Sequence, residues 1–251
     1  MSDLMLLSQA QMRQIKPYFP LSRGIPRVDD RKIISGIIFV IRNGLRWCDA
    51  PKEYGPHKTI YNRFIRWSRL GVFGRILAEL TARCGKPKQL MIDTTHLKAH
   101  RTAASLLKKG DVARRIGRTK GGLNSKLHAV CDGHGRPLLM LLSEGQMSDY
   151  RGAALMLKAL PNAKVLIADK GYDADWFRDA LAARRIAACI PPRASRKIPI
   201  PHHPALYRTR CKIENMFGKL KDWRRIHTRY DRCAHTFFSS ICIAAAVIFW
   251  L

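Results

Sequence analysis

Two short stretches, QLMID at residues 89–93 and VLIAD at residues 165–169, decide the fold predicted for this chain. Each is a run of apolar residues that ends in an acid, Asp93 in the first and Asp169 in the second. Short apolar runs of this length are typical of buried strands. If the two strands are neighbours in one sheet, both carboxylates emerge at the same edge and are held rigidly there.

A third acid, Glu214, lies in a predicted helix over 208–225. Tyr207, Arg210 and Lys221 stand at helical spacings from it, so the four side chains form one stripe. Such a stripe is costly to bury, but beside a phosphate each member has a role. Arg210 can grip a phosphate with two donors, Lys221 can add a point charge, and Tyr207 can donate its hydroxyl or stack on a base. We therefore expect Arg210 and Lys221 to hold phosphate rather than to pair with Glu214.

Asp93, Asp169 and Glu214 together have the chemistry of a metal site. Carboxylate oxygens are the ligands that Mg²⁺ prefers, and Mn²⁺ can substitute. Three carboxylates can hold two such ions about 4 Å apart, one activating a water or a 3′-hydroxyl and the other stabilising the leaving oxygen. Taken singly, an acid at a strand end is more often a turn-forming residue. The prediction therefore depends on the three acids meeting in space.

The charge of the chain points to a polyanionic partner. Lys and Arg number 46 against 18 Asp and Glu, which gives a net charge of +28 and a pI near 10.5. This excess is far beyond what solubility requires, and it favours nucleic acid over an anionic membrane. The seven cysteines form no C-x-x-C pair, which favours a reducing cytosol over a disulfide framework or a zinc ribbon. The N-terminus lacks the layout of a signal peptide, and the apolar run 241–251 predicts a buried terminal helix.

Residues 1–86 read as a small all-helical domain. Helices are predicted over 9–16, with Ser8 as its cap, and from Asp29 to Asn43, where the pair Asn43-Gly44 stops it. A third is predicted over 58–70, followed by one more that ends near Cys84. The helix over 58–70 is expected to carry an outward basic face made of Arg63, Arg66 and Arg69. Short helices with one basic face are typical of a helix-turn-helix DNA-binding module. A helical dimerisation domain has a similar pattern and remains an alternative.

Residues 87–251 read as an α/β domain with a mixed sheet and flanking helices. After the strand at 89–93 we expect a basic loop from His96 to Gly122, in which Arg101, Arg118 and Lys120 can contact DNA. The elements expected beyond that loop are a hairpin of 123–131 and 136–142, a helix over 150–160, a strand over 164–168, a helix over 175–185, a strand over 187–190 and the helix 208–225.

Several other residues invite a functional interpretation. His96 and His100 have the spacing of zinc ligands on a helix, but we expect them to be structural or to lie in a phosphate-binding loop. Asp173 is expected to support the second acid and Asp175 to cap the next helix. Lys170, directly after Asp169, is expected to contact phosphate. The tryptophans are expected in the core rather than stacked on bases; these are Trp47, Trp67, Trp176 and Trp223.

The spacing Y-(2)-R-(3)-E-(6)-K of the stripe resembles the signature of bacterial insertion-sequence transposases of the DDE type. The resemblance covers nearly the whole chain from about Leu7. Further stretches resemble one branch, the IS-five family: 46–49, 61–64, 93–96, 117–126, 168–173 and 224–231.

The resemblance implies an RNase H-like catalytic domain over 87–251, behind a helical domain over 1–86 that binds the ends of the element. It implies that Asp93, Asp169 and Glu214 bind metal and catalyse, and that Tyr207, Arg210 and Lys221 assist with DNA. The interval between Asp169 and Glu214 leaves no room for the large β-domain that some related transposases carry there.

The expected function is therefore that of a DNA transposase. It would bind terminal inverted repeats, cut a strand at each end and join the freed 3′-hydroxyl to target DNA, as a homodimer or larger assembly in a bacterial, nucleoid-associated cytoplasmic setting without a membrane partner. Two alternatives remain open. One is a metal-dependent nuclease of the same fold that only cuts, and the other is a domesticated DNA-binding regulator without activity.

The charge analysis makes a prediction about salt. Binding of the chain to a short DNA duplex should weaken steeply as the salt concentration rises, because each phosphate neutralised by Lys or Arg contributes about −0.9 to the slope of log K against log salt. Fluorescence anisotropy over a salt series measures that slope. An affinity that hardly changes with salt would show that the charge serves solubility instead.

Overall fold

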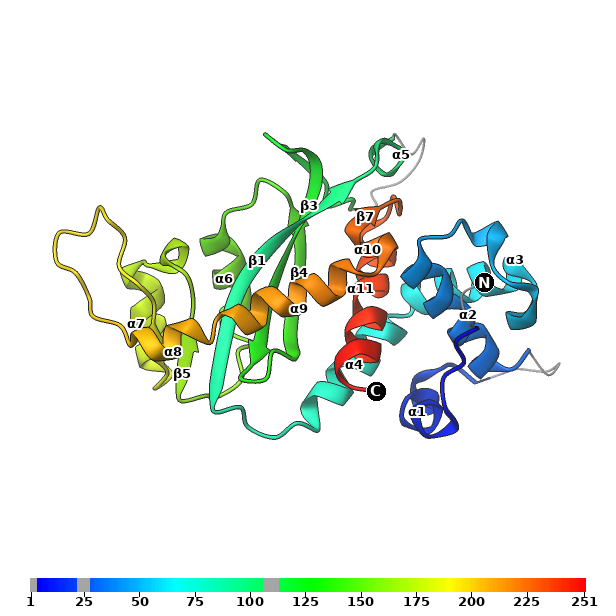
Figure 1. The fold of residues 1–251 in the computed structure, drawn as a ribbon, viewed down its shortest axis with the longest axis horizontal. Helices are drawn as coiled ribbons and strands as arrows, with labels where there is room; N and C mark the ends of the chain where they lie inside the picture. Colours follow the sequence, from blue (N-terminus) through cyan, green and yellow to red (C-terminus); the bar gives the residue numbers. More distant parts are fainter. Residues whose placement is uncertain (1–3, 22–27, 106–112) are drawn as a thin grey trace. The chain divides into compact units, whose positions relative to one another are not determined.

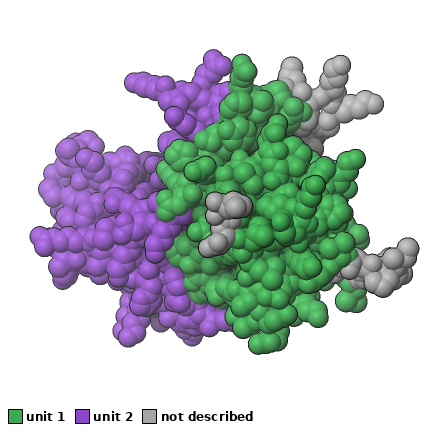
Figure 2. Space-filling model, turned by 45° about the vertical axis from the view of Figure 1, so that its right-hand side comes forward, with its two compact units in different colours: residues 1–80, 100–114, 220–251 green, residues 81–99, 115–219 purple. Residues whose placement is uncertain are grey.

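The computed structural model describes residues 4–21, 28–105 and 113–251. The chain forms two compact units, drawn in different colours in Figure 2. The first unit contains residues 1–80, 100–114 and 220–251, and the second contains residues 81–99 and 115–219. The C-terminal segment therefore folds with the N-terminal helices. The functional division expected from the sequence, end binding by 1–86 and catalysis by 87–251, remains a prediction.

The first unit is helical, with one short strand. Its elements are α1 (Gln9–Ile15), a 3₁₀ turn η1 (Lys16–Tyr18), α2 (Asp30–Asn43), the 3₁₀ turns η2 (Trp47–Asp49) and η3 (Lys52–Tyr54), α3 (His57–Arg69), α4 (Val72–Ala82), α5 (Arg101–Ala104), α10 (Arg224–His227), β7 (Thr228–Arg229) and α11 (Ala234–Phe249); α4 extends two residues past the unit's limit.

The predicted helix limits in this unit follow from local chemistry. Ser8 caps α1 in a reciprocal capping box with Gln11, and the Asp29 side chain caps α2 by accepting from the Arg31 N–H. Gly44 ends α2 in the left-handed conformation, with φ of 71°, as the Asn43-Gly44 pair predicted.

The core of this unit needs the C-terminal helix. Ile37, Ile60 and Phe237 are fully buried, and α11 packs against both α2 and α3. The predicted buried terminal helix is confirmed, since α11 is buried over most of its length. A fragment that ends at residue 86 would therefore lack part of its core. Among the helices of the described residues, none combines the length and apolarity needed to cross a membrane.

The second unit is a mixed sheet with helices on its faces (Figure 1). Its strands are β1 (Gln89–Ala99), β2 (Gly117–Thr119), β3 (Gly122–Asp132), β4 (Pro137–Glu144), β5 (Val165–Ile167) and β6 (Ala187–Cys189). Its helices are α6 (Asp149–Leu157), the 3₁₀ turn η4 (Lys170–Tyr172), α7 (Asp175–Ala183), α8 (Pro204–Arg208) and α9 (Cys211–Lys221), of which α9 crosses the limit between the units.

The sheet has the order β2-β3-β1-β5-β6, with β4 also paired to β3. β1 runs antiparallel to β3 and parallel to β5, and β5 runs parallel to β6. The α/β mixed sheet predicted from the sequence is confirmed, as is the hairpin of β3 and β4. The core on one face joins sheet residues such as Leu90 and Ile92 to Met156 of α6 and Phe177 of α7.

Two predicted elements differ from the structure. The strand that begins at 89 continues to Ala99, because its polar continuation pairs with β3 in register as far as Lys98 opposite Asn124. Part of the basic loop expected over 96–122 is therefore strand, and residues 106–112 of it lie outside the described residues. The single helix expected over 208–225 is divided into α8, α9 and α10.

The packing of α2 makes a prediction about stability. Gly36 lies where an added Cβ would stand 2.8 Å from Cβ of Tyr54, so Gly36→Ala should destabilise the fold by about 1–3 kcal/mol through overpacking. Gly74→Ala in α4 is the matched control. It meets no atom within 4 Å and should stabilise by up to about 1 kcal/mol. Urea unfolding of both variants checks this, and equal effects would contradict the packing described for α2.

Candidate active site

Asp93 and Asp169 lie side by side at one edge of the parallel strand pair. In β1 and β5, Leu90 is opposite Leu166 and Met91 is opposite Ile167. Continuing this register by two residues brings Asp93 opposite Asp169. The prediction that the two strands are neighbours is confirmed.

Side-chain alternation also places both acids on one face of the sheet. Leu90 and Ile92 face the core under α6 and α7. Asp93 therefore faces the other side, where Arg210 contacts it. Helix α9 follows Arg210. Its residue Lys212 contacts the turn between β3 and β4, where the ammonium donates to the carbonyl of Gly133 at 2.7 Å.

The Asp93 carboxylate is mostly buried and accepts hydrogen bonds from two donors. One oxygen accepts from the Thr94 N–H at 2.8 Å and the other accepts from a terminal nitrogen of Arg210 at 2.6 Å. Burial raises the pKa of Asp93 above its usual value, and the nearby Asp169 carboxylate adds to the rise, against the opposing effects of Thr94 and Arg210. The two aspartates therefore already interact as like charges.

Asp169 has an unsatisfied oxygen. Its Oδ1 is buried and has no hydrogen-bond partner among the described residues. A Cβ at residue 171 would stand 2.7 Å from this oxygen, so Gly171 leaves the space that the carboxylate occupies. A buried carboxylate oxygen without a donor is costly unless a cation or water satisfies it.

Arg210 joins the first acid to the third. Its guanidinium pairs with Asp93 and also with the carboxylate of Glu214, one helical turn further along. The expectation that Arg210 holds phosphate rather than pairing with Glu214 is therefore wrong for the protein without DNA. Burial alone would lower the pKa of Arg210, but the charges of Asp93 and Glu214 outweigh it and raise the pKa.

The break between α8 and α9 gives Arg210 this position. Thr209 ends α8, and its hydroxyl donates to the Leu206 carbonyl at 2.7 Å while accepting from the Gln89 side chain at 2.8 Å. Arg210 follows at the junction, and its N–H donates to the Tyr207 carbonyl at 2.9 Å. The break thus ties the start of α9 to the first residue of β1.

The carboxylate oxygens of Asp93, Asp169 and Glu214 are suitable ligands for divalent cations, although they are not arranged around one common point. Asp93 and Asp169 are neighbours at this edge, Arg210 links Asp93 to Glu214 of α9, and one buried oxygen of Asp169 lacks a donor. No group of three His, Cys, Asp or Glu side chains within 4–21, 28–105 and 113–251 is arranged closely enough to hold a metal. The reason is visible in the ion pairs, since the guanidinium of Arg210 separates Asp93 from Glu214.

Sequence reasoning missed a network behind Asp93. The Thr94 hydroxyl donates to Asp149 at 2.9 Å, and the ammonium of the buried Lys126 donates to the same carboxylate oxygen at 3.1 Å and to the Met147 carbonyl at 2.7 Å. These contacts fix the backbone beside Asp93 from the face that α6 covers. Lys126 is the last residue of the stretch 117–126, which resembles the IS-five family. No feature of the sequence marks its partner Asp149 as part of the site.

The other residues predicted to contact DNA fall into groups. Lys170 is exposed directly after Asp169, and Arg118 and Lys120 are exposed at the turn between β2 and β3. Tyr207 packs edge-on against His202 with ring centroids 5.6 Å apart. Lys221 ends α9, and burial lowers its pKa.

The remaining candidates belong to the helical unit. Arg66, Arg69 and Arg101 are exposed there. The expected outward position of Arg63 is wrong, since its side chain is 13% exposed and pairs with Asp30 of α2.

Four other expectations concern residues near the site. Asp175 does not cap α7, because Ala174 holds that position. Trp176 is 41% exposed and is not part of the core. His96 contacts the Gly145 carbonyl at 3.0 Å, and His100 instead caps α5, so their side chains have separate structural roles.

Comparison with protein families matches almost the whole chain. Residues 7–77 match DUF4096, a family described as transposases of the IS4/5 family, and residues 85–249 match the transposase DDE domain. A protein of Brucella ovis named as a transposase for insertion sequence element IS6501 is 35% identical over 130 residues, which cover 51% of this chain and 99% of that protein. One of Burkholderia cepacia, named for element IS402, is 28% identical over 55% of this chain and 72% of its own length.

A solved structure supports the fold. The piggyBac transposase, in a synaptic complex with hairpin DNA, aligns with 94% of this chain and 69% of its own at a TM-score of 0.53 and 9% identity. The RNase H-like fold class expected from the sequence is confirmed.

The Arg210 bridge makes a prediction about stability. Arg210→Met should destabilise the metal-free protein by about 1–3 kcal/mol, because it leaves two carboxylates without their cation. In an Asp93→Asn background, Arg210→Met should lower the free energy of unfolding by less. The coupling energy between the two substitutions should be about 1 kcal/mol in a double-mutant cycle, measured by urea unfolding with chelator present.

The matched control is a second double-mutant cycle, in which Arg210→Met is combined with Asp179→Asn instead of Asp93→Asn. Asp179 is an exposed acid of α7. This pair should show no coupling with Arg210→Met. Equal coupling in the two cycles would rule out the bridge.

Proposed function

We propose that this chain, which belongs to the DDE transposases of insertion sequences, cuts DNA at the ends of its element and joins the freed 3′-hydroxyls to target DNA. Its identity as a DNA transposase follows from the matched families. The observation that supports the chemistry is the adjacency of Asp93 and Asp169 at one sheet edge, with Glu214 joined to Asp93 through Arg210.

Asp93, Asp169 and Glu214 would hold two divalent ions, Mg²⁺ or Mn²⁺. When bound, such ions act as Lewis acids that activate the attacking oxygen and neutralise charge on the leaving oxygen. Asp93 and Asp169 are fixed by strand pairing, whereas the Glu214 side chain is 54% exposed and can change rotamer. We therefore assign the rigid part of the site to the aspartates and the adjustable part to Glu214.

Arg210 has two states in this proposal. Without DNA it compensates the charge of Asp93 and Glu214. With DNA, Asp93 and Glu214 would serve as cation ligands instead, and the released guanidinium of Arg210 would be able to bind a phosphate of the strand being cut through its forked donors. Lys170, Tyr207 and Lys221 would contact neighbouring parts of the same DNA. Release of Arg210 thus couples the filling of the site to DNA binding.

Recognition of the element ends is assigned to the helical region, where Arg66 and Arg69 are exposed on α3. Arg63 is left out of this surface because Asp30 pairs with it. Arg101, Arg118 and Lys120 would bind phosphates without reading sequence. Two ends must be brought together for transposition, which requires at least a homodimer in the DNA complex.

The proposal predicts the effect of neutralising each acid. Asp93→Asn, Asp169→Asn and Glu214→Gln should each lower strand cleavage and joining by at least about a thousandfold, because the loss of a metal ligand removes several kcal/mol of transition-state stabilisation. Binding to an end duplex should remain intact. Labelled end duplexes and a supercoiled target, incubated with Mg²⁺, measure cleavage and joining separately.

Asp179→Asn is the control and should keep full activity. Near-normal cleavage by any of the three variants would remove that residue from the triad. Cleavage without joined products in the unaltered chain would favour the nuclease alternative, and binding without cleavage would favour the domesticated regulator.

A further inference from the structure

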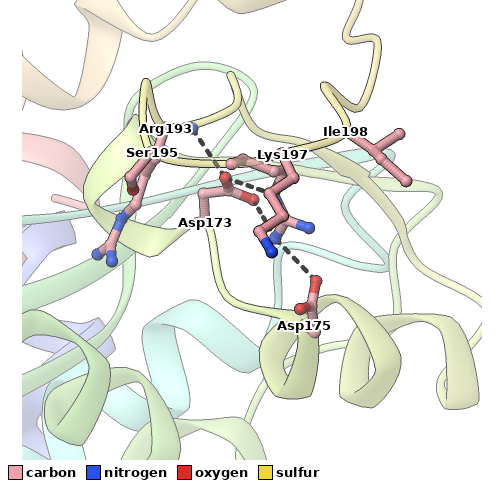
Figure 3. A pocket seen from close by; sticks show the side chains of 7 residues that line it. Asp173, Asp175, Arg193, Ser195, Lys197 and Ile198 are labelled. Atoms are coloured by element: carbon pink, nitrogen blue, oxygen red, sulfur yellow. Dashed lines mark hydrogen bonds and ion pairs between the residues drawn. The ribbon is translucent and has the colours of Figure 1, made fainter.

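A second candidate binding site lies in the segment between β6 and α8. A pocket of about 410 Å³ opens there within the second unit. Figure 3 shows Asp173 below the segment that carries Arg193, Ser195 and Lys197, with Asp175 at the start of α7 on the other wall. The remaining lining residues are Arg196 and Ile198.

Asp173 anchors the segment to the rest of the unit. Its buried carboxylate accepts from Arg178 at 2.9 Å, from the Arg193 N–H at 2.8 Å and from two nitrogens of Arg196 at 2.9 and 3.0 Å. Burial alone would raise the pKa of Asp173, but these donors, Arg196 first, outweigh it and lower the pKa to about 2. A fully bonded carboxylate of this kind fixes the backbone around it, and so the segment is held in one place.

Arg193 connects the segment to the turn that follows Asp169. Its side chain donates to the Lys170 carbonyl at 3.1 Å and to the Gly171 carbonyl at 2.8 Å, and its guanidinium lies over the Tyr150 ring at 4.6 Å. Lys170 and Gly171 belong to η4, which begins directly after Asp169. The pocket and the second acid of the site are therefore positioned by the same short piece of backbone.

The ion pairs leave the pocket positively charged. Arg178 and Arg196 compensate Asp173, and Arg196 also pairs with the exposed Asp175 at 2.7 Å. Among the described residues, neither the guanidinium of Arg193 nor the ammonium of Lys197 forms an ion pair with a carboxylate. Lys197 and Ser195 are both exposed. The Lys197 ammonium at an open pocket suits a phosphate, held on the segment side because Asp175 would repel it from the other wall.

We propose that Lys197 binds a backbone phosphate of the DNA strand that runs past Asp169, in the positive field of Arg193. The proposal rests on the proposed function, since it needs DNA at the active site. A strand whose phosphate is cut beside Asp169 continues into neighbouring phosphates, and the anchoring of the segment to η4 keeps Lys197 at a fixed place relative to that acid. Asp173 acts as the positioning residue of this site.

Two charge reversals test the site. Lys197→Glu should weaken the binding of an element-end duplex about tenfold, because a charge-assisted hydrogen bond is lost and a repulsion is added. It should also reduce the slope of log K against log salt by about 0.9, the contribution of one phosphate. Lys158→Glu is the matched control, since Lys158 is exposed in the same unit at the end of α6 and the change in net charge is identical.

Hydrogen exchange of the full chain adds a direct readout. The amides of 193–198 should gain protection when the duplex binds, and Lys197→Glu should lose that protection while Lys158→Glu keeps it. Circular dichroism melts should show both variants folded.

Each other outcome has a separate meaning. Equal affinity and equal salt slopes for the two variants would overturn the pocket assignment while leaving the proposed function intact. Protection of 193–198 by inorganic phosphate as strong as that by the duplex would show a small-anion site and overturn the DNA assignment. Failure of the unaltered chain to bind DNA would overturn the proposed function together with this site.

Discussion

The parallel pairing of β1 with β5 is the constraint on which the rest of the site depends. It sets Asp93 opposite Asp169 and turns both toward the face that Arg210 contacts. Two carboxylates brought together and partly buried repel each other, and burial together with Asp169 raises the pKa of Asp93. The fold offsets this cost with a cation of its own, Arg210. The same pairing that brings together the two proposed metal ligands therefore requires the arginine that pairs with Asp93.

The sequence predicted those features that depend on short-range pattern. The apolar runs before Asp93 and Asp169, the cap at Ser8 and the stop at Gly44 all carry their signal within a few residues, and the structure has them as expected. The adjacency of Asp93 and Asp169 was also predictable, because strand neighbours share an edge. Among the described residues the three acids do not form a closed cluster, because Arg210 stands between Asp93 and Glu214. Their metal and catalytic roles remain predictions.

The failures involve partners far apart in the chain. Arg63 faces inward because Asp30, on another helix, pairs with it. Asp149 supports Thr94 through a contact between residues 55 positions apart. Arg210 pairs with Asp93 across 117 positions. Helical spacing places residues on one side of a helix, but it does not show which distant charge meets them. The break between α8 and α9 also separates Tyr207 from the helix that carries Glu214 and Lys221.

The central claim is that Asp93, Asp169 and Glu214 together form one metal centre. Counting the Mn²⁺ ions bound to the full chain with an element-end duplex, by electron paramagnetic resonance of the free ion, tests it most directly. The account predicts two ions per chain in the unaltered protein and none at this site when Asp93→Asn, Asp169→Asn and Glu214→Gln are combined. Equal numbers of bound ions in the two proteins, both folded and both bound to DNA, would contradict it.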